Sequence, residues 1–315
     1  MSKRTAVAQQ RDRAPRRRRL AVSGALAAAA LAAGGLFLAS TGDGDPAGYE
    51  GAASALPPLE VETGVVHVHG LGVDPGDGVL YAATHSGLFR IPEQGTAARV
   101  ANRAQDTMGF SVVGPGRFIG SGHPDFREDD VRPPLLGLIE SGDRGETWDR
   151  ISLHGQADFH ALHAAHGNVY GYDSTSGTFM VSKDREEWDR RSELPMADFA
   201  VSPTDPDTVL AATEAGVVRS DDGGRTWKQV PGAPTLAVLA WAGQGQLYGA
   251  TPDGVVQRSA DGGATWETRG DVGGQPEAVT VDARDGKETL YVAASGRGIL
   301  ESADQGRTFT TRYSE

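Results

Sequence analysis

The sequence predicts an all-β protein built from six similar units of four short strands each. Two observations carry this prediction: a short turn segment recurs, and its copies follow pairs of β-rich runs that are separated by a glycine-containing turn. The recurring segments are SGDRGETW (141–148), SDDGGRTW (220–227), SADGGATW (259–266) and SADQGRTF (302–309). A fixed period of roughly 20–50 residues is typical of solenoids and propellers.

The spacing of the copies sets the size of the unit. A degenerate copy, SKDREEW, begins at Ser182, so successive copies start 41, 38, 39 and 43 residues apart. Matching hairpins cover residues 79–91, 208–220, 246–259 and 289–302. An apolar run precedes each hairpin, and a further run follows each copy of the turn. Four strands in about 40 residues are typical of one β-propeller blade.

Six blades account for the chain from residue 61 to residue 315. The first blade lacks the recurring turn, and the segment PEQGTA takes its place. We expect the segment 59–64 to close the ring by adding a strand to the last blade, and a seventh, irregular blade is the alternative. The predicted blades cover residues 67–101, 106–153, 158–192, 198–231, 236–270 and 277–313.

The N-terminal part predicts export. Residues 1–19 are basic, and residues 20–40 form a run of 21 uncharged, mostly apolar residues. A helix of about 20 apolar residues spans a bilayer core, and flanking arginines stay cytoplasmic. We expect a retained membrane anchor with an extracytoplasmic C-terminal domain, or a secreted protein if the helix is a cleaved signal. Residues 41–60 are rich in Gly, Pro and Ala and predict a flexible linker.

Composition excludes several classes of function. The chain has no cysteine, which rules out disulfides, thiolate metal sites and cysteine nucleophiles. The formal net charge is −12, although eight Lys and Arg residues lie in the first 20 positions. The remaining body is therefore still more acidic, and it would repel a phosphate backbone. We expect no nucleic-acid partner.

The recurring turn predicts a structural role. Its Asp carboxylate is placed to accept backbone N–H bonds, its Gly permits a positive φ, and its Trp or Phe is suited to pack into the fold. A residue type that nearly every blade needs is more simply structural than catalytic. The carboxylates concerned are Asp143, Asp222, Asp261 and Asp304.

The pattern Ser-x-Asp-x-Gly-x-Thr-Trp resembles the Asp-box, or BNR repeat, of sialidase-like propellers. The resemblance covers nearly all of residues 61–315 and implies a β-propeller, with a sialidase-like glycoside hydrolase as one implied activity. Such an enzyme would place an F/Y-R-I-P arginine at the channel, but here Phe89–Pro92 lies in the strand that aligns with GVVRS, away from it. The segments HVHGL, TMGF, SGHP and DFHAL also resemble an exported bacterial Asp-box subgroup classed as glycosyl hydrolases.

The histidines mark a candidate site. All eight lie between residues 67 and 166, and blade two carries an insertion, residues 120–134, that holds His123. Innermost strands line the channel of a propeller. To find equivalent positions on these strands, we took the residue twelve positions before the Tyr or Leu of the second strand in each blade. Alternation along a strand adds neighbours on the same face. The predicted ligand-binding residues are His67, His69, Met108, His123, Asp158, His160 and Asp198.

These residues suggest three functions. The first is a binding protein for a small ligand or a metal, with His67, His69, Asp158 and His160 as metal ligands, because imidazole and carboxylate suit Zn or Cu(II) and methionine suits Cu(I). The alternative is a structural role, in which the same groups line a water-filled channel and form hydrogen bonds to water and backbone. The second function is a glycoside hydrolase acting on a glycan at the same mouth, and the third is a scaffold that docks another envelope protein.

Overall fold

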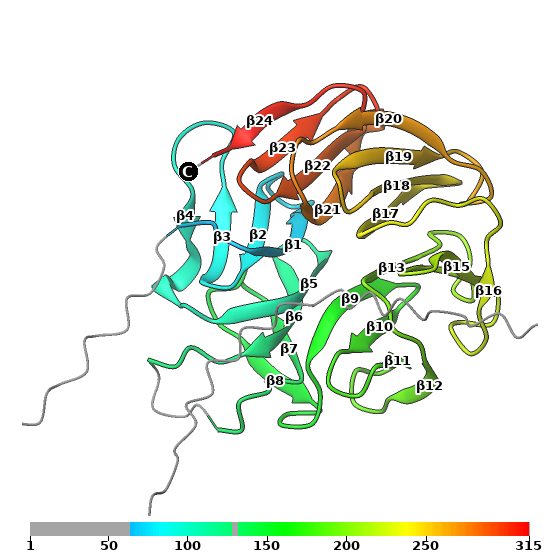
Figure 1. Ribbon diagram of the computed structural model, residues 1–315. Coiled ribbons are helices and arrows are strands. Elements are labelled where there is room, and N and C mark those ends of the chain that lie inside the picture. Colours follow the sequence, from blue (N-terminus) through cyan, green and yellow to red (C-terminus); the bar gives the residue numbers. More distant parts are fainter. Residues whose placement is uncertain (1–63, 128–131, 315) are drawn as a thin grey trace, which may run out of the picture. The chain divides into compact units, whose positions relative to one another are not determined.

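The computed structural model describes residues 64–127 and 132–314, and it confirms the six-bladed β-propeller. Six antiparallel sheets of four strands each follow one another around a centre (Figure 1). In each sheet the chain runs outward, from the innermost strand to the rim. The predicted N-terminal helix (20–40), the basic segment (1–19) and the linker (41–60) lie outside the described residues.

The strands fall into four rings. The innermost strands are β1 (Val68–Val73), β5 (Asp106–Gly114), β9 (Phe159–Ala165), β13 (Asp198–Val201), β17 (Val238–Gly243) and β21 (Pro276–Asp282). The second strands are β2 (Leu80–Thr84), β6 (Arg117–His123), β10 (Asn168–Asp173), β14 (Val209–Thr213), β18 (Gln246–Ala250) and β22 (Thr289–Ala294). The third strands are β3 (Gly87–Ile91), β7 (Leu138–Ser141), β11 (Thr178–Ser182), β15 (Gly216–Ser220), β19 (Val255–Ser259) and β23 (Gly298–Ser302). The rim strands are β4 (Ala98–Arg99), β8 (Asp149–Ser152), β12 (Asp189–Glu193), β16 (Lys228–Gln229), β20 (Glu267–Asp271) and β24 (Thr310–Tyr313), and two short 3₁₀ turns are η1 (Val100–Asn102) and η2 (Arg284–Gly286).

Packing between blades explains the apolar strands. The second strands β2 and β14 are buried along their whole length, because a neighbouring blade covers each face. Phe179 of blade 3 packs against Phe199 and Trp227 of blade 4, with ring centroids 5.0 and 5.6 Å apart. The core is thus divided into clusters between blades rather than gathered in one centre.

Blades 1 and 6 close the ring. Strand β1 contacts both β5 and β21, and one buried cluster joins Leu71 of blade 1 to Ile299 of blade 6. The backbone N–H of Val68 donates to Glu277 Oε2 across the same junction, at 3.1 Å. The closing strand expected at 59–64 lies almost wholly outside the described residues. Among the described residues, the last blade takes all four strands from the C-terminal end.

The recurring turn connects the third strand to the rim strand. In the copy that begins at Ser259, Asp261 Oδ1 accepts from the Thr265 N–H at 2.8 Å, and Asp261 Oδ2 accepts from the Thr265 hydroxyl at 2.6 Å. Ser259 Oγ accepts from the N–H of Gly263, whose φ is +89°. These hydrogen bonds lower the pKa of Asp261 to about 2, and the one from the Thr265 hydroxyl has the largest effect. The same Thr hydroxyl bond recurs at Asp143, Asp222 and Asp304.

No helix among the described residues is long and apolar enough to cross a membrane.

Candidate functional site at the channel mouth

The innermost strands enter their sheets through an irregular step. In blades 1, 2, 3 and 6 a register shift at the start of the strand leaves one extra residue, which is His69, Met108, His160 or Glu277. Blades 4 and 5 make a similar step. The N–H of Ala197 donates to the carbonyl of Ala212, which also pairs with the next residue of the strand, and the N–H of Ala237 donates to the carbonyl of Ala250 in the same way. A β-bulge re-aims side chains. These six residues all line one cavity of about 210 Å³.

Strand pairing corrects the register derived from the sequence. The twelve-residue spacing equates His69 with Asp158, whereas the pairing equates it with His160. The reason is that the connection from the first to the second strand varies in length. It runs from Val73 to Leu80 in blade 1 but only from Ala165 to Asn168 in blade 3.

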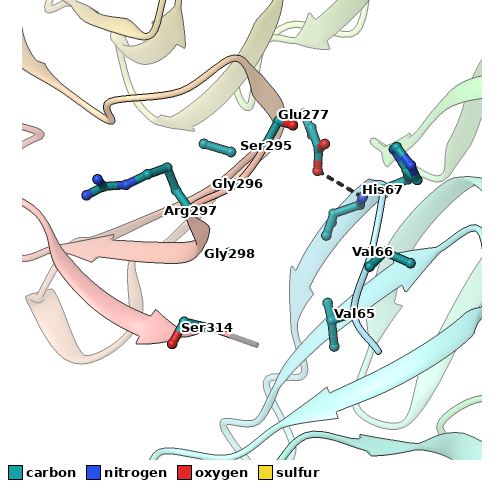
Figure 2. Close-up of a pocket in the computed structure, with 11 residues that line it drawn as sticks. Val65, Val66, His67, Glu277, Ser295, Gly296, Arg297, Gly298 and Ser314 are labelled. Carbon is teal, nitrogen blue, oxygen red and sulfur yellow. Dashed lines mark hydrogen bonds between the residues drawn. The ribbon is translucent and has the colours of Figure 1, made fainter. Parts of the chain in front are cut away.

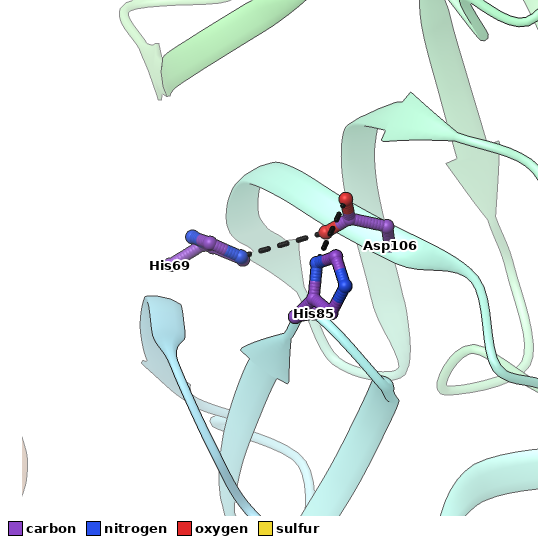
Figure 3. A group of neighbouring side chains, drawn as sticks. All are labelled: His69, His85 and Asp106. Atoms are coloured by element: carbon purple, nitrogen blue, oxygen red, sulfur yellow. Dashed lines mark ion pairs between the residues drawn. The ribbon is translucent and has the colours of Figure 1, made fainter. Parts of the chain in front are cut away.

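Asp106, at the start of β5, is the centre of the cluster. Its Oδ1 lies 3.4 Å from His69 Nε2, and its Oδ2 lies 3.1 Å from His85 Nδ1. Figure 3 shows the two imidazoles pointing at the carboxylate, His69 from β1 and His85 from the turn between β2 and β3. The Nδ1 atom of His123, at the end of β6, lies 3.3 Å from the same Oδ2. Three histidines from two blades therefore surround one carboxylate.

The contacts continue into blade 3. The other ring nitrogen of His123, Nε2, lies 3.7 Å from Asp158 Oδ2. The same oxygen lies 3.0 Å from His160 Nε2 and 3.3 Å from the Ser174 hydroxyl. The side chain of Asp158 is only 8% exposed. His123 thus bridges two carboxylates that come from different blades.

The electrostatics of the cluster rest on histidines. Every ion pair that the described residues form with Asp106 and Asp158 comes from an imidazole. Burial alone would raise the pKa of Asp106, but the contacts with His123 and His69 outweigh it and hold this pKa well below its usual value. The hydrogen bond to Asp106 raises the pKa of His123, against the opposing effect of burial.

Three polar atoms in the cluster are buried without a hydrogen-bond partner among the described residues. They are His69 Nε2, Asp106 Oδ1 and Asp158 Oδ1. His69 Nε2 and Asp106 Oδ1 face each other at 3.4 Å, as an ion pair without hydrogen-bond geometry. His69, His85 and Asp106 offer three ligand atoms within 4.8 Å of one another.

Other predicted residues lie outside this cluster. His67 is exposed, has a φ of +51°, and lines a second cavity of about 290 Å³ between blades 1 and 6. Figure 2 shows Glu277 reaching toward the backbone beside His67. Asp198 is engaged elsewhere, because its two oxygens accept the N–H groups of Phe199 and Leu239, both at 2.8 Å. Met108 lines the mouth cavity.

Sequence reasoning missed Asp106 and His85. Asp106 lies two residues before the predicted Met108, so alternation along the strand was a signal that could have found it. His85 lies in the tight turn between β2 and β3, which strand alternation does not address. One signal was available, because His85 belongs to the group of eight clustered histidines.

The residues that a sialidase would need do not meet at the mouth. Arg90 lies on β3, the third strand of its blade, and no arginine is among the described residues that line the mouth cavity. A tyrosine–glutamate pair exists at Tyr248 and Glu288, but Tyr248 is fully buried. Burial, first, and Glu288 raise the pKa of Tyr248 to about 12, which is the wrong direction for a nucleophile.

Comparison with known proteins supports the fold and gives a partial sequence match. No known protein-family profile matches the chain. A xyloglucanase from Hypocrea jecorina (strain QM6a) is 32% identical over 149 residues, which are 42% of this chain and 18% of that protein. The chain therefore spans less than a fifth of the length of this curated relative.

Solved structures give the same fold at low identity. A GH74 xyloglucanase from Xanthomonas campestris matches with a TM-score of 0.50 and 19% identity, covering 77% of this chain and 37% of that one. An ancestral GH74 enzyme matches with a TM-score of 0.52 and 15% identity, covering 82% of this chain and 39% of that one. YCF48 from Cyanidioschyzon merolae matches with a TM-score of 0.51 and 11% identity, covering 74% of this chain and 94% of that one. The chain is a β-propeller with glycoside-hydrolase-like neighbours.

Proposed function

We propose that this chain is an exported, membrane-tethered Asp-box β-propeller that binds a divalent transition-metal ion at one mouth of its channel. His69, His85 and Asp106 are the ligands, and Zn or Cu(II) is the ion. One observation carries the proposal: three ligand atoms from three separate segments converge within 4.8 Å of one another.

The geometry suits such an ion. A tetrahedral ion with bonds of 2.0–2.1 Å holds its ligand atoms about 3.3 Å apart. His69 Nε2 and His85 Nδ1 lie 3.4 and 3.1 Å from their respective Asp106 oxygens. Two imidazoles and one carboxylate leave a fourth position for water or a ligand, and this donor set favours Zn and Cu(II) over Mg or Ca.

The location of the protein is also a proposal. Its support is the arginine cluster before the apolar run 20–40, which predicts a cytoplasmic start and an extracytoplasmic propeller. The Asp-box assignment is supported by four good copies of the motif and by the same threonine hydroxyl bond in each of them.

Metal analysis of the full chain, purified in mild detergent and dialysed against Zn or Cu, tests the proposal. We expect stoichiometric metal in the wild type and at least about a tenfold weaker dissociation constant in His85→Ala, because one of three ligands is lost. His67→Ala is the matched control, since this exposed histidine lies outside the cluster. Wild-type protein that retains no metal would refute the site.

A glycoside hydrolase is the second candidate. The observation in its favour is the 32% identity to a xyloglucanase over 149 residues. Hydrolysis of this kind usually needs one carboxyl group that stays protonated. Asp106 is unsuited to that role because the surrounding histidines lower its pKa. Release of reducing sugar from xyloglucan, lost in Asp158→Asn, would favour the hydrolase.

A protein-docking scaffold is the third candidate. YCF48 is one of the structural neighbours, and one of its structures is described as bound to D1 peptide, with a TM-score of 0.50 and 15% identity to this chain. Co-purification of a defined envelope protein that survives His85→Ala would favour the scaffold over the metal site.

A further inference from the structure

The mouth cavity holds carboxylates without basic partners. Among the described residues, no Lys or Arg lines it. Its titratable side chains are Asp198, Glu277, His69, His160 and His163. Two backbone N–H groups already occupy the oxygens of Asp198. A cavity with this lining repels small anions and attracts small cations.

Glu277 is the carboxylate that remains open to a ligand. Its Oε2 atom accepts the N–H of Val68, and no other hydrogen bond or ion pair among the described residues reaches this side chain. An ionised carboxylate has about four acceptor positions, so Glu277 is able to accept further donors. Its side chain is half-buried, and a cation beside it would offset the cost of holding a charge there.

His160 offers the cavity an oriented acceptor. Its Nε2 atom lies 3.0 Å from Asp158 Oδ2, and the side chain of Asp158 is only 8% exposed. Because an ionised carboxylate only accepts hydrogen bonds, the proton of the neutral ring lies on Nε2, and Nδ1 keeps its lone pair. No contact among the described residues occupies Nδ1, and the His160 side chain is 40% exposed where it lines the cavity.

Glu277 and His160 come from opposite sides of the ring. They belong to blades 6 and 3 of six, and both occupy the irregular step that begins an innermost strand. The wall of blades 4 and 5 between them is small and apolar, because these blades contribute Ala197, Ala237 and Leu239. A ligand that reaches both sides therefore needs a donor at each end and a short apolar body.

We propose that the mouth cavity binds a small aliphatic amine that carries a second donor group, as a short diamine does. The ammonium end donates to Glu277, the other end donates to Nδ1 of His160, and the methylene groups pack against the small apolar wall. Neither Glu277 nor His160 is a ligand of the proposed metal site, so the binding of the amine does not require an ion at Asp106.

Isothermal titration of diaminobutane into the full chain, in mild detergent with a chelator, tests the inference. We expect one site per chain. Glu277→Gln keeps an acceptor for the Val68 N–H but removes the charge, and it should weaken binding by about tenfold or more. His160→Ala should weaken binding by about tenfold. His67→Ala is the matched control, since His67 lines the neighbouring cavity and not the mouth.

Succinate has the same chain length with anionic ends and should not bind. Absence of diaminobutane binding, or tighter binding of succinate, overturns the inference. Diaminobutane binding that is unchanged in both Glu277→Gln and His160→Ala, or that is lost in His67→Ala, overturns the location. Thermal melting of each variant shows that weaker binding does not reflect unfolding. The titration contains no metal, so a failure here leaves the proposed metal site standing, and a chain that binds no metal leaves this inference standing.

Discussion

The two halves of the ring share a backbone and differ in chemistry. Where the chain steps into blades 1 and 3 it presents His69 and His160, and at the equivalent steps of blades 4 and 5 it presents Ala197 and Ala237. Both halves keep the same four-stranded sheets, and an intact copy of the recurring turn occurs in each half, at Asp143 in one and at Asp261 in the other. The contrast shows that the repeat supplies the scaffold, whereas a few non-repeated side chains supply the candidate site.

The largest expected effect concerns the scaffold. Phe179→Ala should lower the free energy of unfolding by about 3–5 kcal/mol, because this fully buried ring packs against the next blade and its loss leaves a cavity. Urea titration of the full chain measures the change. Phe126→Ala, at a side chain that is 62% exposed, is the control and should stay within about 0.5 kcal/mol. Equal losses in both variants would contradict the division of the core into inter-blade clusters.

The second effect concerns the site and should leave the scaffold intact. His85→Ala should weaken Zn or Cu binding by about 10- to 100-fold, or about 1.4–2.8 kcal/mol, while the unfolding midpoint without metal changes little. The reason is that His85 is 60% exposed and its ring contacts mainly Asp106. Isothermal titration and urea curves on the same preparation check both parts. A variant that unfolds more easily yet binds normally would reverse the interpretation.

The third effect sharpens the comparison, because the turn occurs in both halves. Thr265→Ala and Thr147→Ala should each cost about 0.5–1.5 kcal/mol, since each removes a 2.6 Å hydroxyl bond to the Asp of its turn. The depressed pKa of Asp261 means that its contribution to stability is present above about pH 4 and is lost as the pH falls toward about 2. NMR titration of Asp261 should show this pKa rise in Thr265→Ala. Unequal costs in the two halves would mean that the turns are not equivalent.

The smallest effect is a pH dependence confined to the histidine-rich half. The pKa of His123 is raised in the folded protein, so its contribution to stability is present below about pH 6.5 and is lost as the pH rises through the folded value. Unfolding curves of metal-free protein between pH 5 and 8 measure the slope. His123→Gln should flatten it, and an unchanged slope would assign the pH dependence to another histidine.

Much of the fold was predictable because a repeat reports its own boundaries. The predicted third blade, 158–192, agrees with strands that run from Phe159 to Glu193, and the number of six blades is confirmed. The site was only partly predictable. Connections of unequal length shift the strand registers, so the sequence equated His69 with Asp158 rather than with His160. Asp106 was overlooked, although it lies two residues before the predicted Met108. Asp198 was chosen for its charge, but backbone N–H groups of two blades occupy it, which only the folded chain reveals.

The irregular step at the start of each innermost strand has a practical consequence. Every blade places one residue of this irregular step at the mouth cavity. The ligand that the cavity binds therefore depends on only a few side chains. A designer who rewrote those positions would retain the sheets, the turns and the packing between blades. Substitutions at these positions should therefore change the binding selectivity of the protein and leave its propeller fold intact.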